Sequence, residues 1–384
     1  MSTDLRGRVA AVGVAEAGVG EVGPGLTPLD LLGRAAHAAV TEAGLGIHDV
    51  DGLFTASSTH PAAPLDTAEY LGIRPRYMDG TLVGGSSFVS HLLHAATAIE
   101  AGLCEVALIA YGSTQRSAAG KLVARTRLNP YEAPYRPRFP VTMYALAASR
   151  HMHRFGTTRE QLAEVAVAAR AWAGLNPHAW ARDPLTVEDV LNSRPVSSPL
   201  RVLDCCLVTD GAGAVVLTSA ERARDLPRKP VYLLGAAEAT THQNISQMPD
   251  LTTTAAAVSG PRAFAAAGLT PADVDVVQLY DAFTINTLLF LEDLGFCPKG
   301  EGGAFVSGGR IAPGGELAVN TNGGGLSYCH PGMNGIFLMI EAIRQVRGEC
   351  GARQRPDVEV ALAHGSGGVL SSQVTAVFGA ESTL

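Results

Sequence analysis

Residues 322–334 read NGGGLSYCHPGMN and lie between a strand-like run at residues 317–320 and an apolar, helix-like segment at residues 335–346. Consecutive glycines let the backbone approach a ligand closely or adopt positive φ angles. Four side chains with exchangeable protons follow them: Ser327, Tyr328, Cys329 and His330. Polar groups placed between a strand end and a helix start are typical of ligand sites in α/β proteins. The stretch therefore predicts a functional turn. The alternative is a tight turn with an incidental histidine.

Length and composition restrict the class of protein. The chain has 384 residues, more than one compact core usually holds, which favours two domains. The net charge is −7 and no Lys/Arg cluster is present, which argues against a nucleic-acid partner. The sequence has no signal-peptide pattern and no apolar run long enough to span a bilayer. The six cysteines show no zinc spacing, so we expect reduced thiols, no metal site and a cytoplasmic enzyme.

Two sequence patterns each occur twice, in the same order. Residues 43–51 (AGLGIHDVD) match residues 267–275 (AGLTPADVD), and residues 106–113 resemble residues 360–366. Internal similarity of this kind decides architecture more firmly than local propensity. The chain is therefore expected to consist of two similar α/β halves.

We place the two halves at residues 1–226 and 227–384. The first half carries an insertion at residues 115–201, in which the spacing predicts helices over Val141–Phe155 and from Thr158 to Gly174. This insertion fits two interpretations, a substrate lid or a packing and oligomer-contact segment. Elsewhere, Thr27 and Pro28 predict a helix start, and a strand is predicted from Val215 to Thr218.

Three motifs give this arrangement a family resemblance. Residues 323–331 (GGGLSYCHP) stand where thiolases have Gly-Gly…Gly-His-Pro. Residues 280–283 (YDAF) stand where thiolases have Asn-Glu-Ala-Phe, or His-Asp-Cys-Phe in the sterol-carrier branch. Residues 210–212 (DGA) match the end of the first half. The chain thus resembles the thiolase superfamily, in the branch of sterol-carrier-protein and lipid-transfer-protein thiolase-like enzymes. The resemblance implies an α/β thiolase fold of two βαβαβαββ-type halves, packed as a five-layer α-β-α-β-α core with an inserted loop domain.

The departures from the family pattern concern the nucleophile. A thiolase keeps a reactive cysteine at the start of the buried helix of its first half, where this chain has Gly85. A second catalytic cysteine is replaced by His364. Because thiolate is the strong nucleophile at neutral pH, covalent acyl transfer is not expected. Ser86 or Ser87 is either a substitute nucleophile or a helix cap, and Cys329 is either a misaligned catalytic thiol or filler at a glycine position.

Other parts of thiolase chemistry survive these losses. Donors aimed at a thioester oxygen stabilise an enolate, and a retro-aldol cleavage releases such an enolate without any nucleophile. We expect Tyr280 and Tyr328 to be its base and acid, in an order that the sequence leaves open, and His330 to donate to the thioester oxygen. Asp281 is expected to orient a neighbour. The full set of expected substrate and oxyanion residues is Gly85, Ser86, Asp281, Gly324, Gly325, His364 and Gly367.

The resemblance also implies a substrate and partners. Thiolase-like enzymes without the cysteine include aldolases of bacterial steroid side-chain degradation, which cleave a β-hydroxyacyl-CoA into a ketone and propionyl-CoA. They work with a small zinc-ribbon and OB-fold companion, so a homodimer joined by that companion into a heterotetramer is expected. No cofactor beyond the CoA thioester substrate is expected. The alternatives are a thiolase-type acyltransferase on a β-ketoacyl-CoA and a non-catalytic scaffold for an OB-fold partner.

Overall fold

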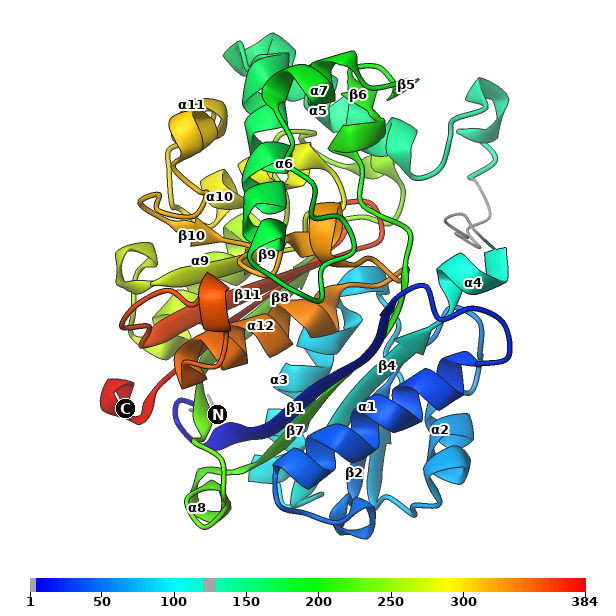
Figure 1. Ribbon diagram of the computed structural model, residues 1–384, viewed down its shortest axis with the longest axis vertical. Coiled ribbons are helices and arrows are strands. Elements are labelled where there is room, and N and C mark those ends of the chain that lie inside the picture. The colour runs from blue at the N-terminus through cyan, green and yellow to red at the C-terminus, as the bar shows by residue number, and fades with distance from the viewer. Residues whose placement is uncertain (1–4, 120–128) are drawn as a thin grey trace.

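The computed structural model describes residues 5–119 and 129–384 (Figure 1). In this part of the chain, ten strands form one mixed sheet in the order β10-β9-β11-β12-β8-β1-β7-β4-β2-β3. The strands of the first half are β1 (Val9–Gly20), β2 (Gly52–Thr55), β3 (Tyr77–Asp79), β4 (Val106–Ser113) and β7 (Asp210–Ser219). Those of the second half are β8 (Val231–Thr240), β9 (Val276–Leu279), β10 (Ala318–Val319), β11 (Val360–Gly367) and β12 (Ser372–Gly379).

The two halves of the sheet have the same topology. Read outward from the centre, each half places its strands in the order first, fifth, fourth, second and third along its own chain. The pairing directions also agree, with β1–β7 and β8–β12 antiparallel and β2–β3 and β9–β10 parallel. Within the sheet of the described residues, the two halves pair where Ala10 and Ala11 of β1 lie opposite Tyr232 and Val231 of β8. The expectation of two similar α/β halves is therefore confirmed.

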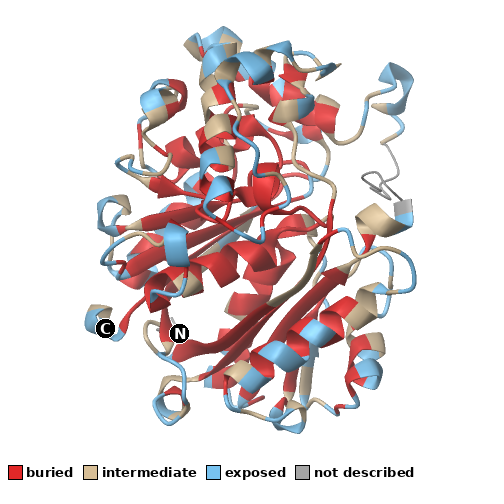
Figure 2. Cartoon of the chain, in the orientation of Figure 1, coloured by how far each residue is buried: buried red, intermediate tan, exposed pale blue. Residues whose placement is uncertain are grey.

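Helices form three layers around the two half-sheets. In the middle, α3 (Ser87–Glu100) and α12 (Gly335–Arg347) contact each other and strands of both halves. Outside the first half lie α1 (Pro28–Glu42) and α2 (Ala63–Leu71), and outside the second lie α9 (Ala256–Ala267) and α10 (Thr284–Asp293). Figure 2 shows that the two central helices are largely buried. This is the five-layer arrangement that the sequence implied.

The described part of the inserted segment folds mainly as helices. Its elements are α4 (Gln115–Ala119), α5 (Val141–Phe155), α6 (Arg159–Gly174), α7 (Val187–Asn192), β5 (Pro195–Ser197) and β6 (Leu200–Arg201). Helix α4 lies beside β7 of the first half, and α5 and α6 lie over the second half. Helix α6 contacts α10, α11 (Gly302–Val306) and the glycine-rich turn. A buried hydrogen bond connects α5 to α10, with His151 Nε2 3.0 Å from Glu292 Oε1. These contacts fit both interpretations of the insertion, so the substrate lid and the packing or oligomer-contact segment both stay predictions.

Local sequence signals located the helices better than the strands. Helix α5 has the predicted bounds, and Thr158 caps α6 through a capping box with Gln161. Strand β7, in contrast, begins at Asp210 rather than Val215. Its glycine-rich start is extended because β1 and β4 pair with it on both sides, so tertiary pairing overrides the weak strand propensity of glycine. The short helix α8 (Ala220–Ala223) then leads to β8.

No helix within residues 5–119 and 129–384 combines the length and the apolar character needed to cross a membrane.

Candidate active site

The glycine-rich turn is a single turn of π-helix, Gly324–Tyr328, held by a buried carboxylate. Asp281 Oδ1 accepts a hydrogen bond from the Gly325 amide at 2.6 Å, and Oδ2 accepts one from the Leu326 amide at 3.3 Å. A Cβ added to Gly324 would overlap with this carboxylate, and the residue has a φ of 60°. The turn therefore needs glycine for both space and backbone conformation. It delivers His330 toward the end of β9.

Tyr280 and His330 meet directly. Tyr280 follows β9, and its hydroxyl lies 3.1 Å from His330 Nε2, with the two rings nearly perpendicular at 87°. The same hydroxyl accepts a hydrogen bond of 3.2 Å from the backbone amide of Asn334, the N-cap residue of α12. The positive end of a helix dipole favours negative charge on such an oxygen. The two side chains thus form a hydrogen-bonded pair, a geometry in which a proton can pass from one to the other.

The phenol of Tyr280 also explains the missing cysteine. A Cβ added to Gly85 would overlap with the ring and the hydroxyl of Tyr280. Gly85 lies just before α3, where the family resemblance places the nucleophile. The phenol therefore occupies the space that a side chain at Gly85 would need. The glycine at position 85 and the tyrosine at position 280 thus depend on each other, because a larger residue at position 85 would clash with the phenol.

Burial keeps the pair uncharged at neutral pH. Desolvation lowers the pKa of His330 to about 4 and raises the pKa of Tyr280 well above its usual value. Two polar atoms close to the pair have no hydrogen-bond partner among the described residues, His330 Nδ1 and Asn334 Oδ1. Unpaired buried polar atoms are rare in folded proteins and call for a ligand or water. They mark this place as the candidate active site.

Tyr328 does not join this pair. Its side chain is buried on the other flank of the π-turn, next to Glu16 of β1 and near Arg344 of α12. Burial and the Glu16 carboxylate raise the pKa of Tyr328, whereas Tyr280 has a different set of neighbours. The predicted pairing of Tyr328 with Tyr280 is therefore corrected. The π-helical turn directs Tyr328 to β1 while His330, two residues later, contacts Tyr280.

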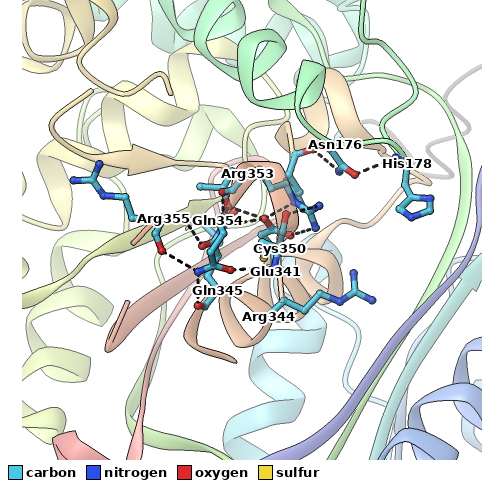
Figure 3. Close-up of polar contacts among 12 residues, drawn as sticks. Asn176, His178, Glu341, Arg344, Gln345, Cys350, Arg353, Gln354 and Arg355 are labelled. Carbon is cyan, nitrogen blue, oxygen red and sulfur yellow. Dashed lines mark hydrogen bonds and ion pairs between the residues drawn. The ribbon is translucent and has the colours of Figure 1, made fainter. Parts of the chain in front are cut away.

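The space beside Tyr328 is a separate cavity of about 890 Å³. Figure 3 shows the polar network along one of its sides, where Arg353 donates to both carboxylate oxygens of Glu341 at 2.9 Å. In the same view Arg344 extends away from that network. Arg344 instead forms an ion pair with Glu16. The charged groups that line this cavity are thus paired either with each other or with charged residues behind the wall.

The predicted oxyanion role of the turn amides does not fit the structure. The Gly325 amide donates to Asp281, and the Gly324 amide donates to Asn322 Oδ1 at 2.8 Å. Neither amide is free for a thioester oxygen. Asp281 does hold its neighbours in place, and burial raises its pKa to about 6.

The remaining predicted site residues have structural contacts. Ser86 Oγ donates to Ser372 Oγ of β12 at 3.0 Å, so Ser86 connects the turn before α3 to β12. Ser87 Oγ donates to the Gly84 carbonyl at 2.7 Å and acts within that turn. Gly367 packs on this turn, because an added Cβ would overlap with the Val83 carbonyl.

His364 was predicted as a substrate residue, and its contacts argue against that role. Its ring nitrogens lie 2.9 Å from Thr375 Oγ1 and from Gln373 Oε1, and the ring packs on Phe290. Both nitrogens are satisfied inside the core. This histidine is therefore not available to a substrate.

Several residues near the pair escaped the sequence analysis. Tyr111 of β4 donates from its hydroxyl to the Pro331 carbonyl at 2.5 Å, and Tyr144 of α5 stacks on Phe283 with ring centroids 4.4 Å apart. Asn286 Nδ2 donates to the Tyr280 carbonyl at 3.2 Å. Asn334 ends the glycine-rich stretch at residues 322–334, so its position near the site could have been predicted. No sequence motif marks Tyr111 or Tyr144.

Comparison with known proteins gives a consistent result. A family model described as thiolase C-terminal domain-like matches residues 237–380. The 17-hydroxy-3-oxo-4-pregnene-20-carboxyl-CoA lyase of Mycobacterium tuberculosis is 37% identical over 368 residues, covering 90% of this chain and 92% of that protein. An acetyl-CoA acetyltransferase of Methanothermobacter thermautotrophicus is 42% identical, but over 250 residues, 65% of each chain.

The fold comparison agrees with the sequence comparison. A solved Ltp2-ChsH2(DUF35) aldolase superposes with a TM-score of 0.89, covering 98% of this chain and 99% of that chain at 33% identity. The chain therefore belongs to the thiolase superfamily, in its sterol-carrier-protein thiolase-like branch.

Proposed function

We propose that the protein is a carbon–carbon lyase that cleaves a β-hydroxyacyl-CoA with a bulky, steroid-like acyl group. The products are a ketone and a short acyl-CoA such as propionyl-CoA. The observation that carries the proposal is the phenol of Tyr280, which fills the nucleophile's place and contacts His330. Full-length similarity to a pregnene-carboxyl-CoA lyase and to a solved aldolase supports the same reaction class.

The retro-aldol step needs only proton movements. The β-hydroxyl proton passes to Tyr280 as Tyr280 passes its own proton to His330 Nε2. The C–O bond of the substrate becomes a ketone, the Cα–Cβ bond breaks, and its electrons form the enolate of the short acyl-CoA. The proton then returns to the enolate carbon, so the pair ends as it began. General acid–base catalysis of this kind contributes about 10²–10⁴-fold to a rate.

The contacts of the pair assign further roles. With the Tyr280 hydroxyl donating to Nε2, the neutral ring of His330 carries its single N–H proton on Nδ1. This is the atom without a hydrogen-bond partner among the described residues. That N–H is the donor for the enolate oxygen. The Asn334 amide stabilises negative charge that develops on the Tyr280 oxygen.

The proposal includes partners. A DUF35-type companion is supported by the similarity to the Ltp2-ChsH2(DUF35) aldolase. The homodimer through the thiolase core and the zinc-ribbon and OB-fold domains of the companion are proposed from the family resemblance alone. The six unpaired cysteines support a cytoplasmic location.

The test is a product analysis. The protein and its companion are incubated with a steroid β-hydroxyacyl-CoA, and mass spectrometry follows the ketone and the short acyl-CoA. Wild type and Ser86→Ala are expected to form both products at similar rates, and Tyr280→Phe to form neither at a comparable rate. Equal product formation by Tyr280→Phe would refute the proposed site.

An acyltransferase is the second candidate, favoured by the 42% identity to an acetyl-CoA acetyltransferase. Intact-mass analysis after incubation with a β-ketoacyl-CoA distinguishes the two reactions, because only the transferase forms a covalent acyl adduct. The buried serines next to Gly85 lack a base among their described contacts, which disfavours this reading. If no acyl-CoA binds with the companion present, the non-catalytic scaffold is supported instead.

A further inference from the structure

A cavity of about 420 Å³ lies on the side of the first half, and one of its lining residues, Tyr111, contacts the residue after His330. Two segments form most of its wall. One is the loop at residues 57–60, which follows β2, and the other runs from the end of β4 into α4, at residues 111–115. Its volume is within the range of small-molecule sites.

Tyr111 connects this cavity with the candidate active site. Its side chain lines the cavity, and its hydroxyl donates to the carbonyl of Pro331, the residue after His330. Its ring packs on Phe88 of α3 at a centroid distance of 4.8 Å. On the same side, a Cβ added to Gly332 would overlap with Gln115 Oε1. Two side chains of the wall, Tyr111 and Gln115, therefore lie against the residues that follow His330.

The lining is neutral and rich in hydroxyl groups. Among the described residues, the wall contains no lysine, arginine, aspartate or glutamate. Its polar groups are those of Ser57, Ser58, Thr59, Ser113 and Thr114, together with His60 and Gln115. The phosphates of CoA would find no cation here, whereas a neutral molecule with hydroxyl or keto groups would find hydrogen-bond partners.

One side chain of the wall, Gln115, gives a separate indication that the cavity holds a ligand. Gln115 Nε2 is buried and has no hydrogen-bond partner among the described residues. A buried amide N–H without an acceptor is costly, and a ligand oxygen in the cavity would satisfy it. A smaller adjoining cavity shares part of the wall and adds the apolar side chains of Leu29, Leu32 and Ala63, together with the polar Asp66 and Thr67.

We propose that this cavity binds the neutral polycyclic part of the acyl group, with Gln115 donating to a ring oxygen. The thioester end of the substrate would then lie at Tyr280 and His330, and the CoA moiety outside the cavity. The inference rests on the proposed function for the identity of the ligand, but its location is independent of the reaction.

The test measures binding of two probes to the full-length protein, with its companion where the two are purified together. Progesterone represents the polycyclic part and free CoA the thioester carrier. Ser58→Trp fills the cavity from an exposed position with no described side-chain hydrogen bond, and Thr41→Trp places the same side chain at an exposed site near the far end of α1. Gln115→Leu removes the unpaired donor.

Wild type is expected to bind progesterone, and Ser58→Trp to bind it at least about tenfold more weakly. Gln115→Leu is expected to lose about threefold to tenfold, as for one hydrogen bond. Free CoA should bind all variants equally, and Thr41→Trp should match wild type for both probes.

Three results would overturn the inference: no binding of progesterone to wild type, unchanged binding by Ser58→Trp, or a loss confined to CoA, which would assign the cavity to the CoA arm. A failure of the proposed function is a separate result. If wild type binds progesterone and Ser58→Trp does not, yet no acyl-CoA is cleaved, the cavity assignment holds and the aldolase does not.

Discussion

Tyr280 and Tyr328 are buried tyrosines on two flanks of the same glycine-rich turn, and their surroundings differ. Tyr280 contacts a neutral histidine and a helix N-terminus, next to polar atoms that lack partners. Tyr328 lies beside Glu16, whose charge is already paired with Arg344. A phenol becomes a proton carrier through its neighbours, so the presence of a tyrosine near a motif identifies a candidate but not a role.

The largest expected difference between the two tyrosines is in catalysis. Tyr280→Phe removes the relay hydroxyl and should lower kcat/KM about 10²–10⁴-fold. Tyr328→Phe should stay within about threefold of wild type, because its hydroxyl has no contact with the pair. Steady-state release of the short acyl-CoA measures both. Comparable losses of kcat/KM in the two variants would mean that both tyrosines contribute to catalysis.

A second prediction concerns Asp281, which holds the turn between the two tyrosines. Its pKa is about 6 in the folded chain and about 3.9 when unfolded, a difference worth about 3 kcal/mol. The folded state binds the extra proton, so this contribution to stability falls as the pH rises from about 4 to 6.

Asp281→Asn should remove this dependence. The unfolding free energy of wild type minus that of Asp281→Asn is expected to decrease by up to about 3 kcal/mol between pH 4 and 7. Urea titrations at several pH values measure it. Taking the difference cancels buried histidines such as His330 and His364, whose lowered pKa values act in the opposite direction. A pH-independent difference would refute the prediction.

A third prediction tests whether Tyr280 occupies the nucleophile's place. Gly85→Ala should destabilise the protein by about 1–3 kcal/mol through overpacking against the phenol. In a Tyr280→Ala background the same change should cost little, because the ring is gone and Gly85 does not have a positive φ. A double-mutant cycle from urea unfolding gives the coupling. Additive effects would mean that the two residues do not compete for space.

The smallest expected effect concerns the contribution of Tyr328 to the unfolding free energy. Tyr328→Phe removes the hydroxyl beside the Glu16 carboxylate and should lower the unfolding free energy by about 1 kcal/mol. The matched control is the same substitution in a Glu16→Gln background, where the loss should be smaller because the carboxylate charge is absent. If Tyr328→Phe has the same unfolding free energy as wild type, the hydroxyl of Tyr328 has no stabilising contact with Glu16, and this prediction is wrong.

Part of the site could be predicted because it depends on motifs with a fixed backbone consequence. The glycines at 323–325, His330 and the Tyr280–Asp281 pair were found from their order, and the structure brings Tyr280, Asp281 and His330 to one place. The roles of individual atoms could not be predicted in the same way. Whether the Gly325 amide faces a substrate or Asp281 depends on a side chain 44 residues away in the sequence.

The sequence by itself determined the two similar halves, the helices with their caps and the loss of the nucleophilic cysteine. Those features follow from internal repetition, helical periodicity and residue chemistry, which act locally along the chain. Only the tertiary structure decided which tyrosine meets His330, why Gly85 has no room for a side chain and where the neutral cavity behind Tyr111 lies. These depend on the direction in which a π-helical turn presents its side chains and on contacts between residues far apart in the chain, and no local pattern encodes either.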